Sequence, residues 1–62
     1  MNDNTPLEKG IIRDVVYDPS HRKASIELYS GQRYVVMGGH DLTPGLTIEV
    51  RLNGTYQKFR GK

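Results

Sequence analysis

The residues best suited to chemistry lie near the C-terminus. From residue 51 onward four cations occur without a carboxylate: Arg51, Lys58, Arg60 and Lys62. Two aromatic residues lie among these cations, Tyr56 and Phe59. Lysine and arginine neutralise phosphates, and aromatic rings stack on unpaired bases. This composition predicts a surface that binds RNA or single-stranded DNA.

A β-hairpin is expected to carry these groups. Residues 46–52 alternate apolar and polar side chains, which is typical of a strand with one buried face. Asn53-Gly54 suits a tight type I′ turn, after which residues 55–60 return as the second strand. Parity along the two strands predicts one outer surface made of four side chains: Arg51, Tyr56, Lys58 and Arg60.

Five short strands are expected in all, over residues 11–17, 24–29, 33–37, 46–52 and 55–60. No window has helical periodicity, and glycine and proline interrupt the chain at short spacing. The pattern predicts an all-β fold, a small five-stranded barrel that is OB-fold-like or, alternatively, SH3-like. Residues 1–9 are predicted to be a flexible tail, and residues 10–62 a single domain.

The apolar positions of these strands predict the core. Its expected members are Ile11 or Ile12, Val15 or Val16, Ala24, Ile26, Leu28, Val35, Met37, Leu42, Leu46, Ile48, Val50, Leu52 and Phe59. Burial of these side chains is largely offset by the loss of backbone entropy in so short a chain. We therefore expect modest stability.

Further candidates for the binding surface come from the middle of the chain. Two tyrosines are expected on neighbouring strands with a cation beside them: Tyr29, Tyr34 and Arg33. Each ring either stacks on a base or lies at the rim with its hydroxyl in water. The loop between the first two strands is basic, with Arg22 and Lys23, and in OB-folds this loop often borders the ligand.

The residue pattern does not suggest catalysis or a metal site. The chain has no cysteine, and its two histidines, His21 and His40, lack a metal-ligand spacing. No nucleophile motif or phosphate-binding glycine loop occurs, so we predict a non-enzymatic binder without cofactor or metal. No apolar run approaches the roughly 20 residues that span a bilayer, and no secretory signal is evident. We expect a cytoplasmic protein without membrane contact.

A resemblance supports the OB interpretation. Residues 10–22 read Gly-Ile-Ile-Arg-Asp-Val-Val-Tyr-Asp-Pro-Ser-His-Arg, which resembles the opening of the OB domain in the large-subunit ribosomal protein of the L-two family. Matching elements continue to about residue 50. Residues 42–50 are also similar to S1-like and cold-shock-like OB domains, including the small bacterial translation initiation factor. The resemblance implies an RNA-binding OB barrel, with a protein partner in a translation or transcription complex as a further expectation.

An alternative function stays open at this point. The chain is small, and its net charge is only +2. Both properties also suit a protein–protein interaction module or a small regulatory inhibitor built on an SH3-like or OB-like barrel. A protein partner would then replace the nucleic acid.

Overall fold

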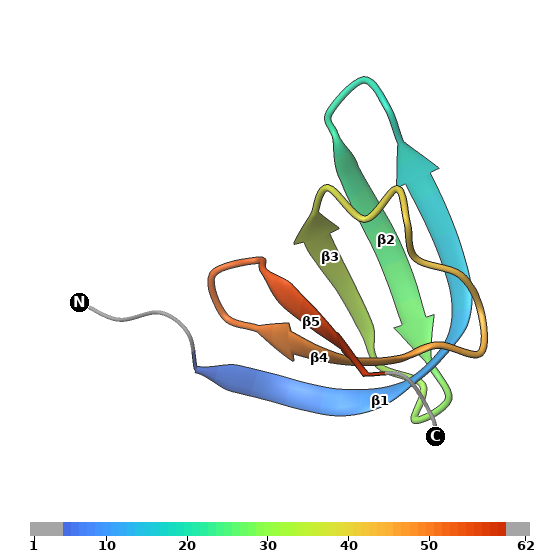
Figure 1. The fold of residues 1–62 in the computed structure, drawn as a ribbon, viewed down its shortest axis with the longest axis vertical. Helices are drawn as coiled ribbons and strands as arrows, with labels where there is room; N and C mark the ends of the chain where they lie inside the picture. The colour runs from blue at the N-terminus through green and yellow to red at the C-terminus, as the bar shows by residue number, and fades with distance from the viewer. Residues whose placement is uncertain (1–4, 60–62) are drawn as a thin grey trace.

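The computed structural model describes residues 5–59, which form one five-stranded antiparallel sheet (Figure 1). Its strands are β1 (Pro6–Asp18), β2 (Lys23–Leu28), β3 (Arg33–Met37), β4 (Thr47–Arg51) and β5 (Tyr56–Phe59). The predicted all-β fold and the five strands are therefore confirmed. No helix in the described part of the chain is long and apolar enough to cross a membrane.

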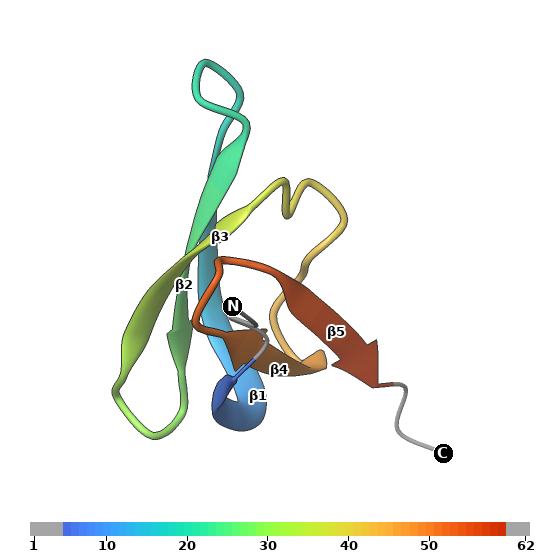
Figure 2. The same cartoon turned by 90° about the vertical axis from the view of Figure 1, so that its left-hand side faces the viewer.

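The strand order is that of a Greek key. The sheet runs β3-β2-β1-β4-β5, so three hairpin-connected strands are followed by β4, which returns beside β1. Figure 2 shows the edge strands β3 and β5 diverging. Within residues 5–59 no strand ladder joins them; one bond, from the Met37 amide to the Gly54 carbonyl at 2.8 Å, links β3 to the β4–β5 turn. The sheet is thus not closed into the predicted barrel.

β1 serves both halves of the sheet and bends between them. Its first half pairs with β4 and its second half with β2. A bulge at Arg13 separates the pair Ile12–Leu28 from the pair Asp14–Glu27. The extra residue switches the face that points to the core. This switch explains the two consecutive apolar pairs, in which Ile12 is buried whereas Ile11 and Val16 are exposed.

β1 also begins earlier than the sequence suggested. Residues 6–9 belong to it and pair with β4, for example Lys9 with Glu49. The predicted tail is therefore wrong for this segment, while residues 1–4 lie outside the described part. Backbone ladder bonds need no apolar side chains, and proline is tolerated as the first residue of a strand.

The core lies inside the curved sheet. Its buried side chains are Ile12, Ala24, Ile26, Leu28, Val36, Leu42, Ile48 and Val50. The prediction for β3 is wrong in its parity, because Val36 is 0% exposed whereas Val35 is 57% exposed and Met37 is also exposed. Val36 pairs with buried Ala24, and opposite residues share a face. Leu52, also predicted to be buried, lies exposed in the β4–β5 turn.

Candidate nucleic-acid interface

The C-terminal hairpin does not present the surface predicted from parity. Tyr56 pairs with Val50 and Lys58 with Ile48, so both follow the core side of β4 rather than the outer side with Arg51. The predicted grouping of Arg51, Tyr56 and Lys58 on one outer surface is therefore wrong. Arg60 lies outside the described residues.

The length of the turn explains the difference. The Arg51 amide donates to the Thr55 carbonyl at 3.0 Å, which leaves three residues in the loop, ending at Gly54. Gly54 has a φ of +84°, while Asn53 does not have a positive φ, so the turn is not type I′. A one-residue change in register moves every following side chain to the other face.

Asp41 holds the two displaced residues. Its carboxylate accepts a hydrogen bond from the Tyr56 hydroxyl at 2.7 Å and another from the Lys58 ammonium at 2.6 Å. The Lys58 bond, followed by the Tyr56 bond, lowers the pKa of Asp41 to about 2. Burial and the Asp41 carboxylate raise the pKa of Tyr56 to about 12. These contacts tie the β3–β4 loop to β5, so we assign Tyr56 and Lys58 a structural role.

The other candidate residues are spread over the molecule. Tyr34 is half-buried against the core, and its hydroxyl donates to the Glu8 carboxylate at 2.8 Å, which raises the pKa of Tyr34. Arg33 lies on the outer side of β3, 3.9 Å from Glu27. Arg22 and Lys23 are exposed where the β1–β2 loop enters β2. The structure does not bring these groups together.

A different row of side chains crosses the outer face of the sheet. Phe59 pairs with Thr47, Thr47 pairs with Ile11, and the Tyr29 amide donates to the Ile11 carbonyl at 3.1 Å. We call Tyr29, Ile11, Thr47 and Phe59 the aromatic row. Tyr29 is 66% exposed and Phe59 is half-buried. Three strand spacings of about 4.8 Å place these two positions about 14 Å apart.

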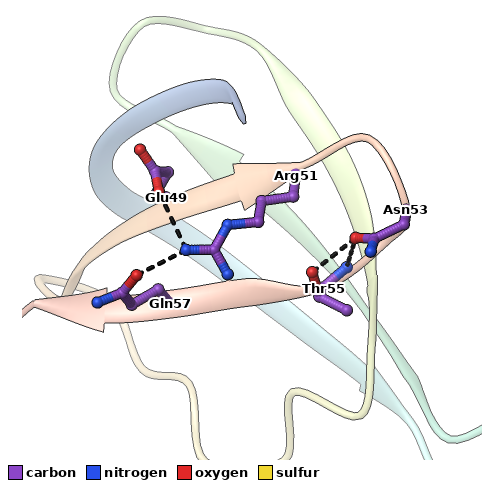
Figure 3. A network of polar contacts seen from close by, with 5 residues as sticks. All are labelled: Glu49, Arg51, Asn53, Thr55 and Gln57. Atoms are coloured by element: carbon purple, nitrogen blue, oxygen red, sulfur yellow. Dashed lines mark hydrogen bonds and ion pairs between the residues drawn. The ribbon is translucent and has the colours of Figure 1, made fainter. Parts of the chain in front are cut away.

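Charged residues lie beside the aromatic row on the same face. The Lys9 ammonium lies 4.0 Å from the centre of the Phe59 ring. Arg51 donates to Glu49 at 3.3 Å and to Gln57 at 2.6 Å, as Figure 3 shows. Near Phe59, the described residues Lys9 and Arg51 therefore accompany one carboxylate, Glu49, which is already paired with Arg51. Cations and rings together suit phosphates and bases.

Comparison with known proteins adds no assignment. The chain matches no protein-family model, no curated protein and no solved structure. Its function is therefore inferred from the chemistry of its own surfaces.

Sequence reasoning missed two members of this face and misplaced a third. The sequence pattern places Lys9 in the tail and offers Ile11 only as an alternative core residue. Phe59 was expected in the core, yet it pairs with Thr47 on the outer side of β4. Leu7, an apolar residue shortly before the β-branched run, was the signal that the strand begins earlier.

Replacing Asp41 by asparagine tests its role as a clamp. We expect a loss of about 1 kcal/mol in unfolding free energy at neutral pH, less than the full pKa shift implies because the side chain is 37% exposed. A carboxyl whose pKa is lowered by folding stabilises above its unfolded pKa of 3.8, and this contribution disappears as the pH falls toward about 2. Urea unfolding of wild type and Asp41→Asn at neutral pH and near pH 2 measures the difference in unfolding free energy at each pH.

A matched control is Asp14→Asn, since Asp14 is exposed and its carboxylate accepts only the neighbouring Val15 amide among the described residues. This control is expected to change stability little. A difference between wild type and Asp41→Asn that stays constant down to about pH 2 would contradict the clamp.

Proposed function

We propose that this chain binds single-stranded RNA or DNA on the outer face formed by β1, β4, β5 and the end of β2. The aromatic row carries the proposal: Tyr29 and Phe59 stack on bases, and Lys9, whose ammonium lies over the Phe59 ring in the free protein, moves from that ring to a phosphate. Aromatic stacking is tolerant of sequence, because every base has a π-face. The proposal concerns binding with little sequence preference, without catalysis.

The shape of the fold supports this function. An OB-fold is a five-stranded, partly open Greek-key barrel, and the strand order and open edges of this sheet agree with that description. The finer assignment to the OB type belongs to the proposal. It is consistent with the resemblance in residues 10–50.

The arrangement of the rings favours a single strand over a duplex. Tyr29 lies at the end of β2 and Phe59 lies on β5, so the two rings flank Ile11 and Thr47. Stacking needs bases whose faces are free, and bases in a duplex are already stacked on each other. The four-residue aromatic row therefore suits bases splayed out along an extended strand.

Titration with fluorescently labelled oligouridine and oligothymidine tests the proposal. Leucine at position 29 or 59 keeps the apolar bulk but removes the π-face. Each of Tyr29→Leu and Phe59→Leu is expected to weaken binding by about 5- to 150-fold, since stacking contributes about 1–3 kcal/mol per base. Arg33→Gln, on the outer side of β3, serves as the matched control and should leave the affinity unchanged.

Salt dependence provides an independent readout. Lys9→Gln should reduce the slope of log affinity against log salt by about 0.7, the contribution of one phosphate contact on a single strand. Wild-type affinity for both oligonucleotides in both leucine variants would contradict the proposed face. So would an equal loss in Arg33→Gln.

A further inference from the structure

The outer edge of β3 presents free backbone groups. The Leu28 amide donates to the Gln32 carbonyl, and the Gly38 amide donates to the Arg22 carbonyl. The backbone groups of even-numbered residues in β3 therefore point toward β2. The backbone groups of odd-numbered residues point away from β2, and the Met37 amide accordingly donates to the Gly54 carbonyl. Within residues 5–59, no partner strand meets the edge groups of Arg33 and Val35.

The side chains beside this edge are largely apolar, and its one cation, Arg33, lies near two carboxylates, Asp14 and Glu27. Val35 and Met37 are exposed on the outer side of β3, and exposed Val16 lies across small Ser25 in the same row. The dip over Ser25 forms a shallow groove of about 270 Å³, lined by Asp14, Val16, Ser25, Ile26, Glu27 and Arg33. These lining residues include no aromatic ring on which a base could stack.

We propose that the β3 edge accepts an extended segment of a different protein as an additional strand. Edge groups at alternate residues match the spacing of another β-strand, which is how sheet edges capture peptides. An apolar residue of the segment would lie beside Val35, and an acidic residue two positions away would pair with Arg33. The Arg33 side chain is 81% exposed and contacts Glu27 only at 3.9 Å, so it is available to a second carboxylate.

A second copy of this chain fits the edge less well. Antiparallel self-pairing centred on Val35 would place Met37 of each copy opposite Arg33 of the other. That ladder needs the Met37 amide, which the Gly54 carbonyl already occupies at 2.8 Å. In that register Met37, rather than a carboxylate, would also face Arg33. A segment of a different protein can pair with Arg33 and Val35 alone, without the Met37 amide, and can place a carboxylate opposite Arg33.

Selection from a phage-displayed random octapeptide library tests this inference on the full chain. Peptides with alternating apolar residues and an acidic residue are expected, and a synthetic copy should shift the amide signals of Arg33 and Val35 in NMR. Val35→Pro removes an edge amide at a position where an edge strand tolerates proline. It should weaken the selected peptide at least about tenfold, whereas Val35→Thr keeps the amide and the branched shape and should change affinity much less.

Arg33→Glu gives a second readout that does not depend on the proline variant. When the library is selected for binding to the Arg33→Glu variant, basic residues should be favoured at the peptide position where wild type selects an acidic residue. Unchanged peptide affinity in Val35→Pro, or unchanged peptide preference in Arg33→Glu, would overturn the inference. Concentration-dependent dimerisation that the peptide abolishes would instead assign the edge to a second copy and overturn it too. Oligonucleotide binding should survive in Val35→Pro, so this test is separate from that of the aromatic row.

Discussion

Gly39→Ala is expected to lower the unfolding free energy by about 2–5 kcal/mol. Gly39 has a φ of +84°, and a left-handed conformation costs an alanine about 1–2 kcal/mol. The added Cβ would lie 2.5 Å from the Cβ of Ala24, which is buried on β2. Overpacking of this kind costs about 1–3 kcal/mol, and a 62-residue domain has only about 3–9 kcal/mol in total.

The preceding residue provides a matched control. Gly38 has a φ of +73°, but a Cβ built there meets nothing within 4 Å. Gly38→Ala should therefore show only the conformational cost, about 1–2 kcal/mol. Urea unfolding followed by circular dichroism compares the two variants. Equal losses would show that the close approach of the β3–β4 loop to Ala24 does not contribute.

Val36→Asp is expected to unfold most of the protein at neutral pH. Val36 is fully buried opposite Ala24, and none of the side chains buried within residues 5–59 is polar or charged. An uncompensated buried charge costs about 3–5 kcal/mol, comparable to the whole stability expected for a domain of this size. Thermal unfolding followed by circular dichroism should show a lost or strongly lowered transition.

Val35→Asp is the control for this prediction, because it introduces the same group one position away on the exposed side of β3. We expect a change within about 0.5 kcal/mol, typical of a surface substitution. If Val35→Asp were the more damaging of the two, the observed parity of β3 would be wrong.

Only part of the candidate interface was accessible from the sequence. Tyr29 and Arg51 were predicted as binding residues, and both lie on the face that carries the aromatic row. Lys9 was missed because short polar segments show no apolar periodicity, and the ladder with β4 that places it is a long-range contact. Asp41 was missed as well, because nothing local indicates that it reaches residues 56 and 58.

The local sequence pattern predicts where the strands form, except for the first five residues of β1. Alternation at period two is a local property, and Ala24, Ile26 and Leu28 are all buried as that alternation predicts. The same holds for Ile48 and Val50 on β4.

Contacts between strands set which side of β1, β3 and β5 faces the core. The three-residue turn places Tyr56 and Lys58 on the core side of the hairpin. The pairing of β3 with β2 places Val36, rather than Val35, on the core side. Within β1, the bulge at Arg13 changes which side of the strand faces the core. The physical reason is common to all three cases: period two identifies a strand, but register with a partner selects its face, and a shift of one residue reverses it.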